Sequence, residues 1–509
     1  MHRLCSTEQT ALGFHCRLDD PSGGFLVEVM PHQALTRNKN KVTSQTMIRF
    51  FRHYISSSAL LQILGDAGFF FCAVYVAPRL VGSHYFHVHD TEGLMGRGFI
   101  FAAVMVSSMT AGGLYESWGW EGGLFGLLKR LLLAISLGIA VMLFLFYAFP
   151  NLFIDHWVLA VSLVLSATII TTQRIVALYW MGLKRMRRNI LVLGTSARAA
   201  KIEHLYHEND RQLAHRINIL GYLPYGNIAH HHISAQRIIP LSEDLLTLAE
   251  KYRAREIVVA VRDRRGSLPM DELFRCRLKG IKVTEISAFF EREVGALQLD
   301  SVNTSWLMYS DGFQHGLIVK RMFDILVSSI LLVVSLPLML AAALLVALEG
   351  RGPIIYTQER VGQFGQPFTI YKFRSMRRDA EKTGQAVWAS VNDTRITRFG
   401  AIMRKFRIDE LPQIFNVLRG DMSFVGPRPE RPSFVDEFNA EFPLYKHRHN
   451  LKPGITGWAQ VCYPYGSSKQ DTLEKLQYDL YYVKNHSLFL DIMILMKTVQ
   501  TVLWGKGAR

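Results

Sequence analysis

The hydrophobic residues of this chain form long blocks in its first third and shorter, regularly spaced runs further on. Apolar blocks at residues 59–77, 99–114, 127–148 and 156–175 approach the ~20 residues that a membrane-spanning helix needs. The second block is short and contains a glycine pair, so it is the least regular. A buried core of a soluble protein is the alternative, but block length and sparse charge favour four transmembrane helices within residues 47–180.

The charges around these blocks predict their orientation. Arg49 and Arg52 precede the first block, basic residues at 184–188 follow the fourth, and the connection at 150–155 has none. By the positive-inside rule, both ends of the four-helix unit face the cytoplasm. Asp66 lies inside the first block, where an acid can mark a transport path. Because no second acid joins it there, we interpret Asp66 as a packed polar contact.

A different period begins near residue 188. The strings "NILVLG", "INILGYL", "EIVVAV" and "IKVTEI" read as buried strands, and helical patterns separate them. Strands that alternate with helices predict a parallel, doubly wound sheet. We therefore expect an α/β Rossmann-like module at residues 188–300.

The first turn of this module is a poor dinucleotide site. Gly194, Ser196 and Ala199 stand where the fingerprint has three glycines, and the second strand ends at residues 223–224 without an acid for a ribose. A regulatory or dimerising module is therefore favoured, and a membrane-anchored nucleotide sensor or oxidoreductase is the alternative. The histidines at 230–232 could ligate a metal, but an exposed loop is the simpler interpretation.

A fifth apolar run, residues 325–348, is long enough to cross a bilayer but has basic residues on both sides. A simple span would place one basic cluster outside, against the charge rule. Pro337 in the middle of the run removes a backbone donor and bends a helix, and Ser335 can satisfy a freed carbonyl. We expect a re-entrant helix at about residues 322–349; an ordinary fifth span with a proline kink is the alternative.

Composition sets the remaining limits. The 509 residues suffice for roughly three domains. Lys and Arg number 58 against 42 Asp and Glu, so the formal charge is +16, which suits an anionic partner such as nucleic acid, phospholipid or a phosphorylated substrate. The basic residues follow membrane edges and turns, which disfavours nucleic acid. Five scattered cysteines indicate neither structural zinc nor a disulfide framework.

The first 46 residues are polar and unpatterned. They lack the short apolar core and cleavage site of a secretory signal, so we expect residues 1–46 to form a disordered extension. The basic, aromatic approach to the first apolar block begins at Met47, which makes Met47 an alternative to Met1 as the start of the protein.

The candidate chemistry lies in "RKFRIDELPQIFNVLRGDMSFVGPRPE", residues 404–430, where Asp409 and Glu410 stand side by side in a basic stretch. Acids at a helix start are the ordinary explanation, because they complement the helix dipole. The strings "YKFRSMRRDAE" (371–381) and "LKPGITGWAQV" (451–461) add residues that handle phosphate. Arginine forks grip phosphate oxygens, and backbone amides in Gly- and Pro-rich turns can cradle them.

These strings resemble the bacterial polyprenyl-phosphate sugar-phosphate transferases, also called monotopic phosphoglycosyl transferases. The resemblance implies a catalytic α/β domain at residues 317–509, and the four-helix unit and Rossmann-like module resemble those of larger exopolysaccharide members. It implies transfer of a sugar-1-phosphate, of the glucose or galactose type, from a UDP-sugar to polyprenyl (undecaprenyl) phosphate with release of UMP. It further implies a homodimer in the bacterial inner membrane, with the catalytic domain on the cytoplasmic face.

The resemblance also assigns roles to residues. Asp409 corresponds to the nucleophile, Glu410 to the acid that helps hold Mg²⁺, and Arg428 to the phosphate-binding turn; Lys372 and Arg374 are weaker substrate-binding assignments. A carboxylate that attacks a diphosphate meets charge repulsion, so a metal and cations are needed there. We expect the surrounding arginines to hold Asp409 ionised. A glycosyltransferase that releases UDP is the alternative, but the chain has no D-x-D metal motif.

Overall fold

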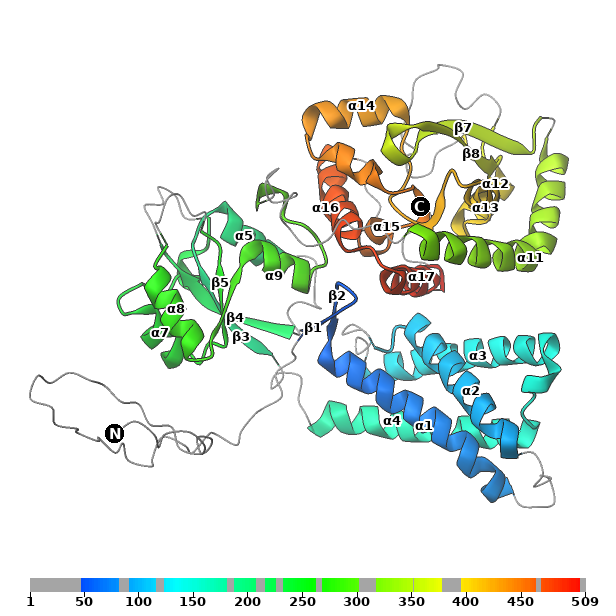
Figure 1. Cartoon of the computed structure of the whole chain (residues 1–509), viewed down its shortest axis with the longest axis horizontal. Coiled ribbons are helices and arrows are strands. Elements are labelled where there is room, and N and C mark those ends of the chain that lie inside the picture. The colour runs from blue at the N-terminus through cyan, green and yellow to red at the C-terminus, as the bar shows by residue number, and fades with distance from the viewer. Residues whose placement is uncertain are drawn as a thin grey trace, which may run out of the picture. The chain divides into compact units, whose positions relative to one another are not determined.

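The computed structural model (Figure 1) describes eleven stretches of the chain. They are residues 47–81, 91–115, 123–180, 187–206, 216–225, 232–261, 268–301, 317–350, 352–377, 395–463 and 468–503. The predicted extension at residues 1–46 and two of the three histidines at 230–232 lie outside them.

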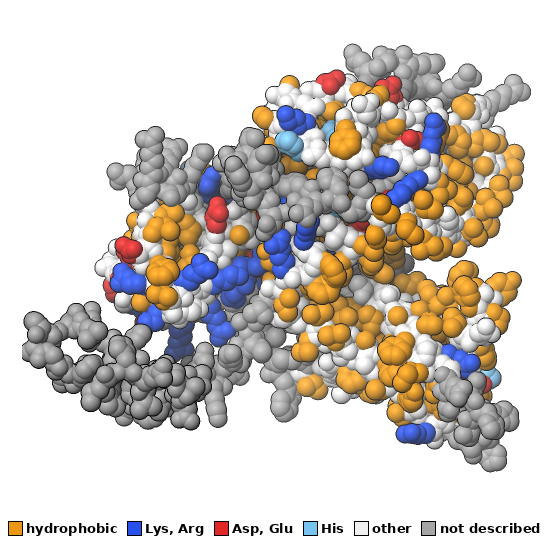
Figure 2. All heavy atoms as spheres, in the orientation of Figure 1, with side chains coloured by type: hydrophobic (Ala, Val, Ile, Leu, Met, Phe, Trp, Pro, Cys, Tyr) orange, Lys and Arg blue, Asp and Glu red, His pale blue; other side chains and the backbone are white. Residues whose placement is uncertain are grey.

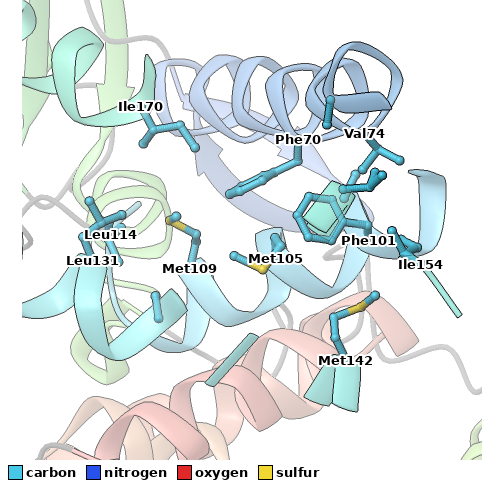
Figure 3. Packing of buried hydrophobic residues seen from close by; sticks show 14 of the residues in the cluster. Phe70, Val74, Phe101, Met105, Met109, Leu114, Leu131, Met142, Ile154 and Ile170 are labelled. Carbon is cyan, nitrogen blue, oxygen red and sulfur yellow. The ribbon is translucent and has the colours of Figure 1, made fainter. Parts of the chain in front are cut away.

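The first, third and fourth apolar blocks each lie within one long helix, and the second block runs three residues past the end of its helix. Their bounds are α1 Ser57–Val81, α2 Thr91–Ala111, α3 Gly123–Ala148 and α4 His156–Trp180. All four are long and apolar enough to cross a membrane. Phe70, Val74, Phe101, Met105 and Met142 pack together between them (Figure 3). Many large apolar side chains on the outer faces are exposed (orange in Figure 2), as expected for helices surrounded by lipid.

The acid in the first block forms a packed polar contact. Arg174 Nη2 on α4 donates to Asp66 Oδ2 on α1 over 2.7 Å, and Arg174 Nη1 donates to the backbone oxygen of Leu114 over 2.9 Å. Both charged side chains are buried. The pair therefore joins α1 and α4 to the end of the α2 segment, in agreement with the structural interpretation of Asp66.

The alternating segment forms a sheet of parallel strands in the order β4-β3-β5-β6. Helices α5 and α9 pack on one face and α7 and α8 on the other, through the apolar sides of each helix. The predicted parallel, doubly wound arrangement is present. The bounds are β3 Arg188–Leu193, α5 Ala197–His204, β4 Ile217–Leu223, α7 Leu245–Lys251, β5 Glu256–Val259, α8 Met270–Leu278, β6 Lys282–Glu285 and α9 Ile286–Glu293.

The C-terminal module combines one long helix, two small sheets and several shorter helices. Its strands are an antiparallel pair, β7 Ile355–Val361 with β8 Pro367–Phe373, and a parallel pair, β9 Ser423–Val425 with β10 Gly454–Thr456. Its helices are α11 Leu317–Glu349, α12 Arg398–Lys405, α13 Gln413–Arg419, α14 Pro432–Glu441, α15 Trp458–Cys462, α16 Lys469–Asn485 and α17 Leu488–Leu503.

Helix α11 contains the fifth apolar run, and both of its ends are bound by side chains from elsewhere in the C-terminal module. Near its start Lys320 Nζ donates to Asp491 Oδ2 over 2.7 Å, and at its end Arg374 Nη2 donates to the backbone oxygen of Gly350 over 2.7 Å. A straight helix of 33 residues would be about 50 Å long. Figure 1 instead shows α11 in two limbs at a marked angle, with Pro337 inside the helix.

The break in α11 differs in one detail from expectation. The hydroxyl of Ser335 was expected to satisfy a freed backbone carbonyl, but it donates to the thioether sulfur of Met339 over 3.6 Å. Because Ser335 is buried, its hydroxyl bonds to an acceptor within the helix, the sulfur of Met339 one turn further on. The bend in the helix thus relies on Pro337 itself.

Two of the motif strings meet backbone to backbone at β9 and β10. Gly426 N donates to Thr456 O and Gly454 N to Pro427 O, each over 2.9 Å. A Cβ atom on Gly454 would lie 2.1 Å from Gly426 N, so only glycine permits this approach. These two amides therefore hold the motifs together, and they do not serve as the phosphate cradle expected from the sequence.

We predict that Gly454→Ala destabilises the protein by more than about 2 kcal/mol, because the added methyl group would strike a backbone that cannot move aside. Thermal unfolding of the purified protein in detergent would measure the change. Gly350→Ala is the matched control, since nothing lies within 4 Å of a Cβ there. Equal unfolding temperatures for the two variants would contradict the close approach of β9 and β10.

Candidate active site

Asp409 and Glu410 lie on a tight turn between two helices. Helix α12 begins at a cap in which Thr397 Oγ1 accepts from Gly400 N over 3.0 Å. After α12, Arg407 has a left-handed backbone (φ 58°, ψ 21°), and residues 408–410 form one turn of 3₁₀-helix before α13. The acids are thus close to a helix start, as predicted, but the described structure shows neither carboxylate capping α13.

The two carboxylates have very different surroundings, although both are buried. Lys372 Nζ and Arg428 Nη2 donate to Glu410 Oε1 over 2.9 and 3.0 Å, and Arg407 Nη1 lies 3.4 Å from Glu410 Oε2. Burial alone would raise the pKa of Glu410, but these three cations hold it well below its usual value. Glu410 therefore stays ionised and gathers cations from three separate parts of the chain.

Asp409 receives much less direct support. Within the described residues, its Oδ1 atom is buried and has no hydrogen-bond partner. Burial, and then the charge of Glu410, raises the pKa of Asp409; Lys372, Arg404 and Arg407 only moderate the rise. The arginines act on the pKa of Asp409 in the expected direction, but burial and the charge of Glu410 outweigh them. An unpartnered buried oxygen is instead ready to bond a ligand atom.

Lys372 is positioned by a buried amide that sequence reasoning missed. Asn416 Nδ2 on α13 donates to Thr369 O over 2.7 Å, and Tyr371 N on β8 donates to Asn416 Oδ1 over 3.1 Å. These bonds tie the helix after the acid pair to the strand that carries Lys372. The available signal was a single amide within the apolar string "IFNVL". Burial lowers the pKa of Lys372, and the charge of Glu410 opposes that change.

Arg428 is fixed by a second buried network that was also missed. Arg448 Nη2 donates to the backbone oxygen of Arg428 over 2.9 Å, and it lies 2.8 Å from Asp479 Oδ2. Arg448 and Asp479 are both buried, so the turn that presents Arg428 is anchored to helix α16. A charged pair of this kind, buried and fully engaged, orients the residues around it.

Arg374 has a different place from the other predicted substrate-binding residues. Its Nη2 atom donates to the carbonyl oxygens of Val346 and Gly350 over 3.0 and 2.7 Å, at the C-terminal end of α11. A cation there satisfies carbonyls that the helix leaves open. Arg374 also borders the cavity described next, so its role in substrate binding stays a prediction.

A cavity of about 560 Å³ opens beside Asp409. Its volume is within the range typical of small-molecule sites. Eleven basic residues and only three acids are among its lining residues, which strongly favours a multiply charged anion. The basic residues are Arg360, Lys372, Arg374, Arg377, Arg395, Arg404, Arg407, Arg428, Arg431, Arg448 and Lys475; the aromatic lining comes from Tyr356, Phe373, Phe434, Phe438, Tyr445 and Tyr463.

The acid pair is chemically suited to a divalent cation that substrate also binds. In the described part of the chain, no cluster of three or more His, Cys, Asp or Glu side chains could hold a metal by itself. Mg²⁺ needs only one or two carboxylates when substrate phosphates supply further oxygens. The ionised Glu410 provides one such carboxylate and fits the predicted Mg²⁺, although it already has cationic partners.

Two helices that line the cavity, α15 and α16, also contact the parallel-sheet module. Ala459 and Gln460 line the cavity, and next to them Trp458 Nε1 donates to the backbone oxygen of Gly295 over 2.7 Å. On α16, Lys484 Nζ lies 2.6 Å from Glu291 Oε1, and both side chains are largely buried. Residues of the sheet module therefore support α15 and α16, two helices that contribute lining residues to the cavity.

Comparison with known proteins places this site in a family. Residues 315–505 match the model of the bacterial sugar transferase family. A UDP-N-acetylgalactosamine-undecaprenyl-phosphate N-acetylgalactosaminephosphotransferase of Aeromonas hydrophila is 46% identical over 237 residues, which cover 47% of this chain and 56% of that protein. A putative undecaprenyl-phosphate N-acetylgalactosaminyl 1-phosphate transferase of Bacillus subtilis is 55% identical over 132 residues, 26% of this chain and 73% of that protein.

A UDP-glucose:undecaprenyl-phosphate glucose-1-phosphate transferase of Xanthomonas campestris is 43% identical over 200 residues, 39% of this chain and 41% of that protein. The match thus spans about half the length of the Aeromonas and Xanthomonas proteins. It covers most of the Bacillus protein at high identity. The chain belongs to the bacterial sugar transferase family, as the resemblance of its motifs predicted.

We predict that Arg407→Gly is more stable than Arg407→Ala by about 1 kcal/mol, because glycine adopts a left-handed backbone without strain. Chemical unfolding of the two variants would measure the difference. Arg404, within helix α12, gives the control of opposite sign: there the Gly variant should be less stable than the Ala variant by about 0.5–1 kcal/mol. The same sign at both positions would contradict the turn before Asp409.

Proposed function

We propose that this protein transfers a sugar-1-phosphate from a UDP-sugar to polyprenyl (undecaprenyl) phosphate, with release of UMP, through a covalent intermediate on Asp409. The observation that carries the proposal is the asymmetry of the acid pair in a strongly basic cavity. Glu410 is neutralised by three cations, whereas Asp409 Oδ1 has no partner in the described structure. Such an oxygen is placed to attack a ligand.

The reaction has two balanced steps. A carboxylate oxygen of Asp409 forms a bond to the sugar-bearing phosphorus, and the bond between that phosphorus and the oxygen of UMP breaks, so UMP leaves with the electron pair. A phosphate oxygen of the polyprenyl phosphate then attacks the same phosphorus, forms the lipid diphosphate and releases the Asp409 carboxylate. Asp409 must be ionised to attack, and Lys372, Arg404 and Arg407 favour that ionised form against burial and Glu410.

The cations around the pair make this attack electrostatically possible. Lys372, Arg407 and Arg428 already surround Glu410, and Arg404 borders the same cavity. They lower the repulsion between the carboxylate and the diphosphate and stabilise the charge that moves to UMP. Mg²⁺, held by Glu410, would neutralise phosphate oxygens further when bound.

The sugar is the least constrained part of the proposal. The Aeromonas and Bacillus relatives named for N-acetylgalactosamine are 46% and 55% identical, and the Xanthomonas relative named for glucose is 43% identical. These identities favour UDP-N-acetylgalactosamine over the glucose or galactose donors suggested by the motifs. A glycosyltransferase is the rival function, and it would release UDP in place of UMP.

The proposal also includes a membrane arrangement. Helix α11 enters from the cytoplasmic face, bends at Pro337 and leaves by the same face, so the cavity lies beside the headgroups of the inner membrane. Hydrogen bonds from both ends of α11 to one module support this topology. The homodimer implied by the resemblance stays a prediction, as does a regulatory role for the sheet module.

We predict that incubation with UDP-N-acetylgalactosamine and Mg²⁺, without lipid, releases at most about one UMP per active site and leaves a sugar phosphate on the protein. Quantified UMP and intact-protein mass spectrometry would measure both. Asp409→Asn should abolish both signals because an amide is a poor nucleophile. Glu410→Gln should slow the release of UMP, and the sugar phosphate should still be attached to Asp409. UDP as the product, or normal turnover by Asp409→Asn, would refute the mechanism.

The topology generates a separate prediction. Ile318 and Leu348 are 78% and 74% exposed, and neither forms one of the polar contacts that hold α11. In a cysteine-free protein in sealed vesicles, Ile318→Cys and Leu348→Cys should both react with an impermeant maleimide from the cytoplasmic side alone. A through-span would give opposite sides. Pro337→Leu in the same background should shift some molecules toward opposite labelling, because it restores the missing backbone donor.

A further inference from the structure

A short β-hairpin that sequence reasoning missed stands immediately before the first membrane helix. Strands β1 Met47–Phe50 and β2 His53–Ser56 pair in antiparallel register, and Phe50 lies opposite His53. Helix α1 begins at Ser57 without a linker, and Ser56 Oγ accepts a hydrogen bond from Ala59 N over 3.2 Å. Each strand is about 13 Å long, so the tip of the hairpin lies about that distance from the start of α1 at Ser57.

The turn of this hairpin has unusual residues. Phe51 (φ 42°) and Arg52 (φ 68°) form a two-residue turn with both residues in the left-handed region. Turns of this geometry strongly prefer Asn-Gly, because most side chains are strained there. A bulky aromatic and an arginine at these positions cost on the order of 1 kcal/mol each. Strained residues of this kind persist where the surrounding structure holds them in place, and they cluster at functional positions.

One side of the hairpin docks on the C-terminal module. His53 is buried, with its Nδ1 atom 3.0 Å from Tyr481 Oη, and burial lowers its pKa to about 4. Ser487 Oγ donates to the backbone oxygen of Phe51 over 3.1 Å, and the Phe50 and Phe489 rings lie 5.3 Å apart. The hairpin is therefore held at the start of α17 by His53, Phe50 and the Phe51 backbone, and the Phe51 ring also stacks on Phe489 at 6.2 Å.

Strand β1 and the tip carry exposed apolar side chains and positive charge. Phe51 is 64% exposed, and Ile48 and Phe50 are each more than 40% exposed. Arg49 and Arg52 supply positive charge, and no acidic residue occurs from Met47 until Asp66. The start of α17 continues the apolar surface with the exposed Leu488 and Ile492. Aromatic rings beside arginines are the combination that anchors proteins at the level of lipid headgroups.

We propose that the hairpin tip, Phe51 and Arg52, is an anchor that inserts into the headgroup layer of a membrane rich in anionic lipid. Three observations favour lipid over a protein occupant. The hairpin is continuous with a helix of membrane-spanning length. Its charge is positive without any acid, which complements anionic lipid. Phe51 at its tip and Ile48 on β1 are exposed, whereas His53 on β2 is docked on the C-terminal module. Through Ser487 the anchor would fix the depth of α17 relative to the bilayer.

The test uses the full chain without its five cysteines, in nanodiscs that contain phosphatidylglycerol. Phe51→Cys, labelled with an environment-sensitive fluorophore, should lose most of its fluorescence to lipids that carry a quencher near the headgroup and little to aqueous iodide. Lys251→Cys, an exposed position on α7, should show the reverse. Quenching of position 51 by iodide alone would overturn the proposal. Protection from both quenchers would also overturn it and would indicate a protein occupant.

A second variant separates anchoring from folding. Phe51→Asn with Arg52→Gly introduces the residues that the turn prefers, so the relief of backbone strain should offset the loss of the ring contact between Phe51 and Phe489. With the fluorophore at Ile48→Cys, we expect this double change to reduce lipid quenching severalfold while Tm does not fall. Unchanged quenching at position 48 would show that the tip is not the anchor. A marked fall in Tm would show that the tip serves folding.

Discussion

The structure of the site depends on one electrostatic constraint, namely that a buried carboxylate keeps a low pKa only when nearby cations compensate its charge. Glu410 meets it with Lys372, Arg407 and Arg428, which come from a strand, a strained turn and the loop after β9. Each cation needs its own support, given by Asn416 on α13, the left-handed backbone of Arg407, and Arg448 with Asp479. The neighbouring Asp409 is left with an unsatisfied oxygen. Much of the polar interior of the module thus shifts the pKa values of two adjacent acids in opposite directions.

A second constraint is that a strongly charged cavity and long apolar helices must fold within one chain. Helix α11 reconciles the two, because its ends are bound by polar side chains of the catalytic module and its middle presents exposed leucines and valines. The close packing of β9 on β10 acts at shorter range, since it brings the two glycine-rich motifs together without side chains between them. Rigid backbone contacts of this kind place charged groups more precisely than flexible surface loops do.

Sequence patterns predicted the long elements and located the acids, because both are local properties. The length of the apolar blocks predicted the long apolar helices, and the alternation of strands with helices predicted the parallel sheet. The acid pair was recognisable because it lies in a basic stretch. Which acid the cations approach was not predictable, since Lys372 and Arg428 lie 38 and 18 residues from Glu410. The same holds for Asn416 and Arg448, whose partners are distant. The hairpin at Met47–Ser56 was missed because four-residue strands are too short to show a period.

The contacts of Trp458 and Lys484 with the sheet module bear on how the catalytic domain could be used alone. In a fragment that begins near α11, the Trp458 indole would lose the Gly295 carbonyl, and the Lys484 ammonium would lose Glu291. Both groups support helices that line the cavity, so their loss would loosen one wall and leave the acid pair intact. A self-sufficient miniature enzyme would therefore need a solvent-compatible residue in place of Trp458 and a new carboxylate for Lys484, and engineering should begin with those two positions.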